Sequence, residues 1–341
     1  MKNKSFILIF ILLIISSCTK DKEILSSLND YNISMESQGY HFGNKIKLPK
    51  AIVENVENIS ISFGDKETKS LIIDANFFTL GKNAVTFIIQ KKNGEVLYQD
   101  ATIVVFARKP ESELSYNLVN EYPHNTKNFT EGFYLEGNVV YESIGQERES
   151  KLMKYTLGGI NVIKESKQSD NIFSEGISSI GDRIYQLTYK NKIGFVYDKD
   201  SFKLLEEFNY PSVISEGWGM TTDGKYLIVS DGSKNIYFLN PKKPSEVIRY
   251  ISVAGNKEIF DKLNELEYHK GFIYANVWQT PIILKINPAN GEVEGKFDFS
   301  EIVKQNTVGN EDVLNGIAFK GDNMVVTGKN WNKIYELQII E

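Results

Sequence analysis

Cysteine and histidine are scarce in this chain. Its 341 residues include one cysteine, Cys18, and three histidines, His41, His124 and His269. A single cysteine excludes an intrachain disulfide and a cysteine-based zinc cluster, and histidines this far apart form no local metal motif. A net positive charge is also missing, because the formal net charge is −5 at pH 7. We therefore expect no nucleic-acid partner and no metal in the functional site.

An apolar run long enough to span a bilayer comfortably is absent as well. Two lysines precede an apolar run of only ten residues, 6–15, and the stretch Ile15-Ser16-Ser17-Cys18 follows. This order of charged, apolar and small residues is typical of a secretory signal. The stretch that ends in Cys18 resembles the lipobox of bacterial lipoproteins, in which the cysteine is lipidated and becomes the mature N-terminus.

This resemblance predicts a signal peptide over residues 1–17 and a lipidated tether over residues 18–27. Removal of residues 1–17 takes away two lysines and no acid, which leaves 37 basic and 44 acidic residues and a net charge of −7. Lipidated Cys18 would hold the protein to the lipid bilayer of a bacterial cell envelope, at the periplasmic face or the cell surface. The alternative is an ordinary signal peptide with a chance cysteine.

The composition is that of a globular protein, and the length suggests two domains. In residues 28–106, the stretch 59–63 alternates as a strand does, and residues 70–73 are expected to pair with it. The Asn-Gly pair within residues 91–94 is a strong hairpin signal. We predict a small Ig-like β-sandwich that acts as a spacer, followed by a polar linker over residues 107–114.

Residues 115–341 repeat a short pattern, in which a polar residue precedes an apolar stretch that often contains glycine. The polar residues are spaced by 44, 41, 48 and 51 residues, and they are Glu131, Glu175, Glu216, Asn264 and Asn315. Periods of about 40 to 50 residues with several strands each are typical of a β-propeller. The sequence therefore predicts an all-β chain, with a five-bladed β-propeller after the Ig-like β-sandwich. The alternative is an array of ordinary β-sandwiches.

The last repeat is too short for a complete blade. From Asn315 to the end there are 27 residues, which is enough for three strands. Residues 116–122 form a strand-like stretch that precedes the first repeat. We expect this stretch to supply the missing outer strand and to close the ring, because closure removes an exposed sheet edge.

Equivalent positions of a propeller lie on a circle around its central channel. We therefore expect the five repeat residues to converge at one mouth of the channel. Like charges there would raise the pKa of at least one carboxyl group, as a general acid/base requires, although structural networks also place polar groups at such positions. Large aromatic residues and one lysine stand nearby and favour a pocket wall, namely Phe129, Phe173, Tyr189, Trp218, Trp278 and Lys329.

Several stretches of the propeller half carry a more specific signal, and they occur in one order. They include Tyr122-Pro123-His124, Phe129-Thr130-Glu131-Gly132, Phe173-Ser174-Glu175-Gly176-Ile177, Glu216-Gly217-Trp218-Gly219, Leu263-Asn264-Glu265-Leu266, Ala275-Asn276-Val277-Trp278, Asp312-Val313-Leu314-Asn315-Gly316 and Thr327-Gly328-Lys329. In this order they resemble the plant and bacterial type of glutaminyl-peptide cyclotransferase. The resemblance does not reach the N-terminal domain.

That family is a five-bladed propeller that converts the N-terminal glutamine of a peptide to pyroglutamate and releases ammonia. The resemblance implies Glu175 as the catalytic general acid/base, with Asn264 and Lys329 as catalytic partners that hold the amide and stabilise its developing oxyanion. It implies a substrate pocket walled by Phe129, Phe173, Trp218 and Trp278. It also implies peptide or protein substrates with N-terminal glutamine, no required cofactor, and no relation to the zinc-dependent animal enzyme.

Some positions depart from the family pattern. Glu131 stands where glutamine is usual, and Tyr189 stands where tryptophan is usual. Asn332 replaces a common proline, and Ile144 a common threonine. We still expect Glu131 and Tyr189 to line the substrate site. A carboxylate at Glu131 would hold the α-ammonium group of the substrate or raise the pKa of the general acid/base.

Two other functions remain open from the residues. One is a propeller lipoprotein that binds peptides or another ligand without turnover, and the other is a calcium-dependent propeller hydrolase. Retention of the three catalytic residues argues against the first, and the second needs a cation with several oxygen ligands. Glu265 and Glu267 are candidates to hold a structural cation such as calcium. We expect His124 to be structural and the protein to be a monomer.

Overall fold

The computed structural model describes residues 22, 25–27, 29–31, 38–159 and 161–340. The chain divides into two compact units, Met1–Arg108 and Lys109–Glu341. The predicted signal peptide and Cys18 lie outside the described residues. Within the described part of the chain, no helix combines the length and the apolar character that a membrane crossing requires.

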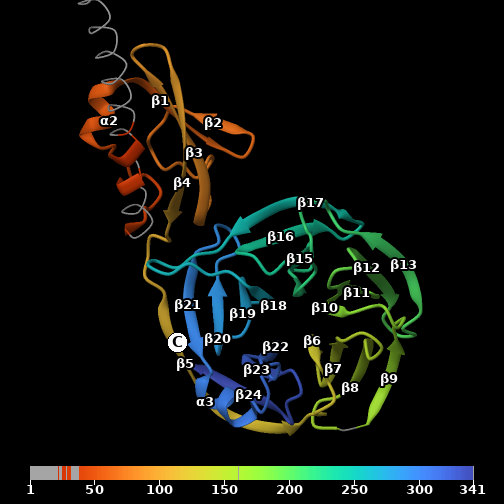
Figure 1. Ribbon diagram of the computed structural model, residues 1–341. Helices are drawn as coiled ribbons and strands as arrows, with labels where there is room; N and C mark the ends of the chain where they lie inside the picture. The colour runs from red at the N-terminus through yellow and green to blue at the C-terminus, as the bar shows by residue number, and fades with distance from the viewer. Residues whose placement is uncertain (1–21, 23–24, 28, 32–37, 160, 341) are drawn as a thin grey trace, which may run out of the picture. The chain divides into compact units, whose positions relative to one another are not determined.

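The N-terminal unit contains one four-stranded antiparallel sheet (Figure 1). Its strands, in order across the sheet, are β2 (Lys66–Thr68), β1 (Val56–Phe63), β3 (Gly81–Lys91) and β4 (Val96–Val105). Helix α2 (Lys50–Asn55) directly precedes β1. Every second side chain of β3 is buried, so one face of the sheet supplies the core of this unit. The predicted hairpin is confirmed, because β3 pairs with β4 around a turn in which Gly94 has a φ of 87°.

The Ig-like sandwich predicted for residues 28–106 is not confirmed, because the described residues of this unit form a single sheet. The expected pairing of residues 70–73 with β1 is wrong. A two-residue turn returns the chain at once, so β2 takes that place beside β1. The Thr68 and Ser70 hydroxyls then accept hydrogen bonds from backbone N–H groups two residues further on, which turns the chain away from the sheet.

The C-terminal unit is a five-bladed β-propeller, as predicted, with four-stranded blades around a centre (Figure 1). Blade 1 consists of β6 (Thr130–Glu136), β7 (Val139–Ile144), β8 (Lys151–Thr156) and β9 (Val162–Lys167). Blade 2 consists of β10 (Ser174–Ile180), β11 (Arg183–Thr188), β12 (Ile193–Asp198) and β13 (Leu204–Asn209). Blade 3 consists of β14 (Met220–Thr222), β15 (Leu227–Ser230), β16 (Asn235–Asn240) and β17 (Lys243–Ser252).

The last two blades are joined by a helix, α3 (Ser300–Asn306). Blade 4 consists of β18 (Leu263–His269), β19 (Phe272–Val277), β20 (Ile282–Ile286) and β21 (Val293–Asp298). Blade 5 consists of β22 (Leu314–Lys320), β23 (Asn323–Gly328), β24 (Lys333–Ile340) and, as its outer strand, β5 (Ser112–Pro123).

Strand β5 closes the ring, as predicted for residues 116–122. It pairs antiparallel with β24 from Ser115↔Ile340 to Pro123↔Lys333. Its first residues also pair in parallel with β21, so the predicted linker, residues 107–114, ends inside a strand. The polar residues of that segment were misleading because the outer face of an outermost strand is solvated.

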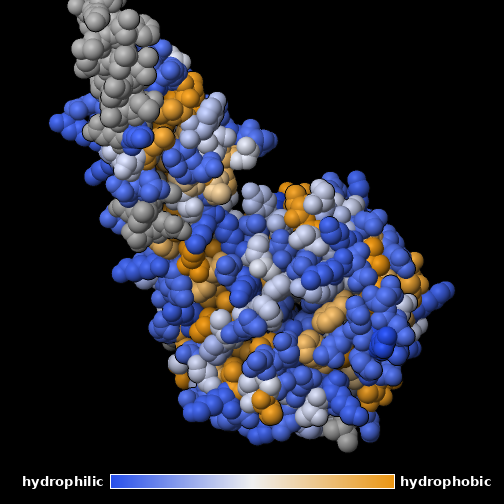
Figure 2. Space-filling view, viewed as in Figure 1, coloured by the Kyte–Doolittle hydropathy of each residue, from blue (hydrophilic) through white to orange (hydrophobic). Residues whose placement is uncertain are grey.

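Apolar side chains fill the junctions between neighbouring blades. A cluster of buried hydrophobic residues lies at each of the five junctions, including the one between the last blade and the first. The surface in Figure 2 is mostly hydrophilic, and its hydrophobic residues are scattered in small areas. The inner ends of the blades are therefore held rigidly, which matters for the site that they carry.

Candidate active site

The innermost strands of four blades carry a β-bulge at the repeated polar residue. In β6, β10, β18 and β22 the register of pairing shifts at this point of the repeat. A bulge bends its strand and re-aims a side chain. The repeated polar residues therefore share a backbone irregularity as well as a place in the sequence. They are Glu131, Glu175, Asn264 and Asn315.

Glycine often follows the polar residue because neighbouring innermost strands approach closely there. A Cβ atom on Gly176 would lie 2.4 Å from the backbone nitrogen of Met220, and one on Gly132 would lie 2.6 Å from that of Ile177. Backbone atoms cannot move aside as the end of a flexible side chain can. The polar-glycine pattern thus reflects the contact between blades.

A pocket of about 390 Å³ lies beside these bulges. Its lining residues are Phe129, Glu131, Gln146, Phe173, Glu175, Tyr189, Trp218, Asn264, Trp278, Glu311 and Lys329. All nine residues predicted to be catalytic or substrate-binding are among them, so the structure brings these residues together. The volume falls in the range of about 300–1000 Å³ that is common for small-molecule sites.

The third repeat behaves differently, and Glu216 does not line the pocket. Strand β14 begins only at Met220, so Glu216 lies in a loop without a bulge. Its side chain is 28% exposed, and it accepts a hydrogen bond of 3.1 Å from the indole nitrogen of Trp218. The prediction that all five repeat residues converge in one ring is therefore wrong for Glu216. Asn315 is buried behind Glu131 rather than in the lining.

Five aromatic rings form a continuous wall of the pocket. The distances between successive ring centres are 6.2 Å for Phe129–Phe173, 5.7 Å for Phe173–Tyr189, 6.5 Å for Tyr189–Trp218 and 5.5 Å for Trp218–Trp278. The Lys329 ammonium lies 4.6 Å from the centre of the Phe129 ring. The rings and the lysine come from strand ends of all five blades, which the junction clusters hold in place.

Two carboxyl groups and an ammonium group are buried together in this pocket. Lys329 Nζ lies 2.6 Å from Glu131 Oε1, and both side chains are almost fully buried. Asn315 Nδ2 donates a hydrogen bond of 3.2 Å to Glu131 Oε2. The Glu131 and Glu175 carboxyls are hydrogen-bonded to each other. The sequence suggested that Glu131 would act on Glu175, and the structure places the two groups in contact.

The surroundings of Glu175 favour its neutral form. Burial raises the pKa of the Glu175 carboxyl well above its usual range, and the negative charge of Glu131 raises it further. The positive charge of Lys329 acts in the opposite direction. At Glu131, burial also raises the pKa, but the charge and hydrogen bond of Lys329 oppose it, so the rise is smaller. A carboxyl that keeps its proton near neutral pH is suited to general acid/base chemistry.

Asn264 adds unused hydrogen-bonding capacity to the pocket. Its side chain is buried, and its Oδ1 atom has no hydrogen-bond partner among the described residues. A buried amide oxygen without a partner is costly, and a ligand amide or amine would satisfy it. The resemblance had assigned this residue to the substrate amide, and its position beside the pocket fits that role.

Two lining residues, Gln146 and Glu311, were missed in the sequence. Gln146 lies in a turn after β7 with a φ of 77°, and Glu311 lies in the loop before β22. Neither belongs to the repeated pattern on the innermost strands, so periodicity gave no signal for them. Residues in loops outside the repeat can be assigned to the pocket only once the three-dimensional structure is known.

A buried carboxyl on β18, Glu265, joins three blades. The Glu265 carboxylate accepts hydrogen bonds from the backbone nitrogens of Ile317 at 2.8 Å and Phe133 at 3.4 Å, in blades 5 and 1. Glu267 accepts a hydrogen bond of 3.1 Å from Thr221, and burial raises its pKa to about 8. Within the described residues, no three His, Cys, Asp or Glu side chains gather as a metal-binding group. A cation at Glu265 and Glu267 stays a prediction.

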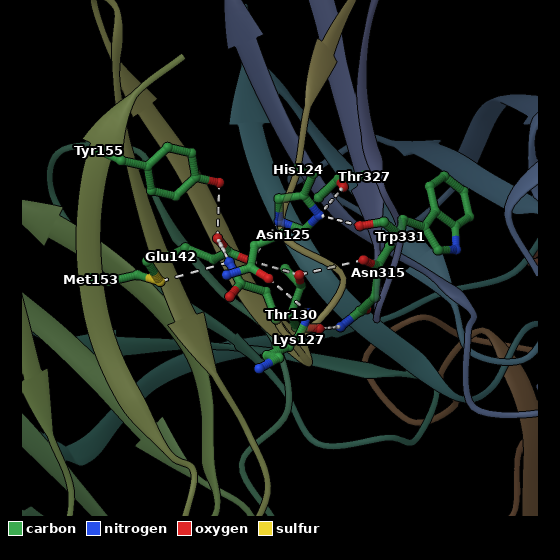
Figure 3. A network of polar contacts seen from close by, with 12 residues as sticks. His124, Asn125, Lys127, Thr130, Glu142, Met153, Tyr155, Asn315, Thr327 and Trp331 are labelled. Carbon is green, nitrogen blue, oxygen red and sulfur yellow. Dashed lines mark hydrogen bonds and ion pairs between the residues drawn. The ribbon is translucent and has the colours of Figure 1, made fainter. Parts of the chain in front are cut away.

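A second hollow, of about 300 Å³, lies at His124, where β5 leaves blade 5. A network of buried polar groups includes His124, Asn128 and Tyr155 from its lining (Figure 3). The buried Glu142 carboxylate accepts four hydrogen bonds, of 2.7 to 3.1 Å, from Thr130, Asn128, Tyr155 and His124 Nε2. His124 Nδ1 lies 2.9 Å from the Trp331 carbonyl oxygen. Because both ring nitrogens face acceptors, this network agrees with a structural role for His124.

The fold and the pocket define a class of protein: a five-bladed β-propeller with a central site made of buried carboxyls, a lysine and an aromatic wall. The family model described as glutamine cyclotransferase matches residues 92–339. The chain belongs to the glutamine cyclotransferase family. The match begins inside the N-terminal unit, earlier than the resemblance noted in the sequence.

Individual relatives agree with this assignment. The chain is 33% identical over 230 residues to a glutaminyl-peptide cyclotransferase of Arabidopsis thaliana, which covers 65% of this chain and 70% of the relative. It also matches the crystal structure of Myxococcus xanthus glutaminyl cyclase with a TM-score of 0.62 and 30% sequence identity. That match covers 68% of this chain and 100% of the bacterial chain.

Proposed function

We propose that this protein cyclises the N-terminal glutamine of peptides to pyroglutamate, with release of ammonia. The observation that carries the proposal is the buried carboxyl of Glu175, in an aromatic pocket that also holds Asn264 and Lys329. Membership of the glutamine cyclotransferase family supports the same activity. Peptides and proteins that begin with glutamine are then the substrates.

The reaction is intramolecular, so orientation is a large part of the task. The α-amine nitrogen must attack the γ-carboxamide carbon of the same residue, which requires the side chain to fold back on the amine. The wall from Phe129 to Trp278 is rigid because each ring contacts the next. A rigid aromatic wall of this kind restricts a bound glutamine and favours its folded-back conformation over an extended one.

A single carboxyl balances the protons of the reaction. The new N–C bond forms first, and a tetrahedral carbon carries the former carbonyl oxygen as an oxyanion. The protonated Glu175 gives its proton to the amide nitrogen as the old C–N bond breaks. It then takes a proton from the former α-amine nitrogen, and ammonia leaves. A proton transfer of this kind contributes about 10²–10⁴ to the rate.

The remaining polar groups have supporting roles. Lys329 brings a positive charge into a pocket shielded from water, where it stabilises the developing oxyanion. The amide of Asn264 holds the carboxamide of the substrate through its unpartnered oxygen. We propose no cofactor for the reaction. The donor groups support this, because His124, the one histidine near the site, already bonds Glu142 and Trp331.

The decisive experiment is an assay of the purified protein with a dipeptide that begins with glutamine. We expect stoichiometric release of ammonia and formation of a pyroglutamyl peptide, measured by a coupled ammonia assay and by mass spectrometry. Binding of the dipeptide without ammonia release would instead support the non-catalytic, peptide-binding propeller.

We also propose that the protein is a monomer, held at the bacterial cell envelope by lipidated Cys18. The sequence pattern before Cys18 supports the anchor, and the net charge of −7 after processing supports the absence of a nucleic-acid partner. The tether and the N-terminal unit would then separate the pocket from the lipid bilayer.

A further inference from the structure

Lys329 forms its ion pair with Glu131 and not with Glu175, the proposed general acid/base. Its ammonium lies 2.6 Å from Glu131 Oε1, in a site where both side chains are at least nine-tenths buried. The second oxygen of Glu131 accepts a hydrogen bond from Asn315. Both oxygens of this carboxyl thus have donors, which is the environment of an ionised carboxylate.

Glu175 has a different environment. Among the described residues, no lysine, arginine or histidine nitrogen lies within 4.0 Å of its carboxyl oxygens. Its carboxyl is hydrogen-bonded to the Glu131 carboxyl. Two carboxyl groups can share a hydrogen bond only if one of them carries a proton. Since Glu131 is the one paired with the ammonium, the shared proton belongs on Glu175.

We infer that Glu131 is a positioning residue which neutralises Lys329 and accepts the hydrogen bond of Glu175, so that at rest these three side chains together hold one reactive proton and no net charge. This inference rests on the proposed function, because it states how the general acid of that reaction stays protonated before the substrate binds. Glutamine at this position would bring no charge. Among the described residues, Glu175 would then be the remaining buried carboxyl beside Lys329, and it would lose its proton.

Other charged or titratable groups face this trio from several elements. Glu216, in the loop before β14, adds a negative charge near Glu175, and Glu311, in the loop before β22, adds one near Glu131. Both lie in loops, and Glu216 is partly exposed, so solvent screens its charge. Tyr210, after β13, also faces Glu175, but burial raises the pKa of its hydroxyl and keeps it neutral. Lys329 is therefore the cation that decides where the proton resides.

The test is the pH dependence of kcat/KM for Glu131→Gln, measured as ammonia release from a glutamine-initiated dipeptide. The pH dependence of kcat/KM reports groups of the free enzyme, and we assign to Glu175 the limb on which activity is lost as this carboxyl loses its proton. Loss of one negative charge and gain of the Lys329 charge should move this limb to lower pH by about 1 to 3 units. A merely structural role for Glu131 would lower the melting temperature and leave the limb in place, and that result would overturn the inference.

Glu216→Gln is the matched control. It removes a negative charge that also faces Glu175 but lies in a partly exposed loop, so we expect a much smaller shift of the same limb. Lys329→Met should move the limb in the opposite direction, to higher pH, because two buried carboxyls would then share the proton without a cation. Equal shifts in Glu131→Gln and Glu216→Gln would contradict a specific role for Glu131.

A measurement without substrate separates this inference from the proposed function. Infrared difference spectra of wild type against Glu175→Gln should show the band of a protonated carboxyl at neutral pH, and Glu131→Gln should lack that band. If wild type shows the band but releases no ammonia, the proposed function fails and the placement of the proton stands. If wild type is active without the band, the inference fails.

Discussion

At the scale of single residues, Glu175 carries the sharpest prediction. Glu175→Gln preserves the shape of the side chain but can neither give nor take the proton. We expect kcat to fall by about 10²-fold or more while the substrate still binds, since the lost interaction belongs mainly to the transition state. Steady-state ammonia release and dipeptide binding measure the two effects separately.

The control for Glu175→Gln is its melting temperature beside that of Glu131→Gln. A purely structural network would let both variants change stability without singling out turnover. Near-normal turnover in Glu175→Gln would exclude this residue as the general acid/base, whatever the effect on stability.

The buried pair of His124 and Glu142 predicts a pH-dependent stability. Burial alone would lower the pKa of His124, but the charge and hydrogen bonds of Glu142 raise it overall. Burial alone would raise the pKa of Glu142, but the charge of His124 and several hydrogen bonds lower it overall. Protonated His124 makes its full contribution to the free energy of unfolding below a pH of about 6.5, and this contribution is lost as the pH rises through the raised pKa of the histidine. Ionised Glu142 makes its full contribution to the free energy of unfolding above a pH of about 4.3, and this contribution is lost as the pH falls through the lowered pKa of the glutamate.

We therefore expect His124→Gln to lower the free energy of unfolding most between pH values of about 5 and 6.5, by about 3–5 kcal/mol. The substitution leaves the buried Glu142 carboxylate without its cation. The deficit should narrow in alkaline solution, where wild type also loses the cation. Thermal melts of both proteins from acid to alkaline pH measure this. A matched double variant, His124→Gln with Glu142→Gln, should recover part of the loss. A deficit independent of pH would show that the histidine is neutral in the folded protein.

Much of the site was within reach of the sequence, for a physical reason. The spacing of Glu131, Glu175 and Asn264 identified the start of each innermost strand, and these positions converge in any propeller. The roles of these residues came from the family resemblance, since spacing carries no chemistry. Glu216 shared the spacing but not the bulge, because its strand begins four residues later. Glu311 lies in a loop outside the repeat, so the fold alone could reveal it.

At the scale of elements, the bulge and its glycine make blade contacts testable. A methyl group at Gly176 would overlap the backbone of the next blade, at 2.4 Å from the Met220 nitrogen and 2.6 Å from the Trp218 oxygen. We expect Gly176→Ala to destabilise the protein by about 1–3 kcal/mol. It should also lower kcat/KM, because the strand that must move leads into the wall of the pocket. Denaturant unfolding and the dipeptide assay measure both.

Gly309→Ala is a matched control in a loop. Its nearest contact from a new Cβ atom would be 3.5 Å, an ordinary distance, so both measurements should stay close to wild type. If Gly176→Ala were as stable and active as this control, the close contact between blades would not constrain the repeat.

The elements that the sequence predicted well are those with a local cause. Asn93-Gly94 specifies a turn by its own backbone preference, and alternation along residues 59–63 specifies a strand. Residues 70–73 also look like a strand, yet the turn before β2 and the hydroxyl groups of Thr68 and Ser70 direct them away from the sheet. Residues 112–114 end a mostly polar segment that looks like a linker, yet their backbone pairs with β21. Strand pairing depends on which sheet edge is available in the folded protein, and the local sequence pattern does not contain that information.

At the scale of the whole molecule, the proposed membrane anchor depends on one residue, Cys18. We expect Cys18→Ala to release the protein from the membrane or to misplace it, because lipidation of that sulfur is the proposed attachment. Fractionation without detergent, followed by immunoblotting of soluble and membrane fractions, measures the outcome. A variant that stays tightly bound to the membrane would refute the lipid anchor and would leave the proposed enzyme activity untouched.

Metal removal tests the chemistry of the complete protein. We expect ammonia release to survive prolonged treatment with a strong chelator, since the proposed acid/base is a carboxyl group and the proposed partner of the oxyanion is the Lys329 ammonium. Assays before and after chelation measure this, with the melting temperature recorded in parallel. Loss of activity that one divalent metal restores would replace the carboxyl mechanism with a metal-dependent one. A fall in melting temperature alone would point to a structural cation at Glu265 and Glu267.

The pairing of β5 with β24 has a consequence for biosynthesis. Ser115 pairs with Ile340, so the first strand of the propeller finds its partner only when β24 has been made. Contacts this distant in sequence form late and slowly. A chain that has been made or exported only as far as β23 therefore cannot complete its ring, which suits a protein whose first residues are proposed to direct it across a membrane before it folds. It follows that a nascent chain that ends between Lys329 and β24 holds every pocket residue and still has an open ring.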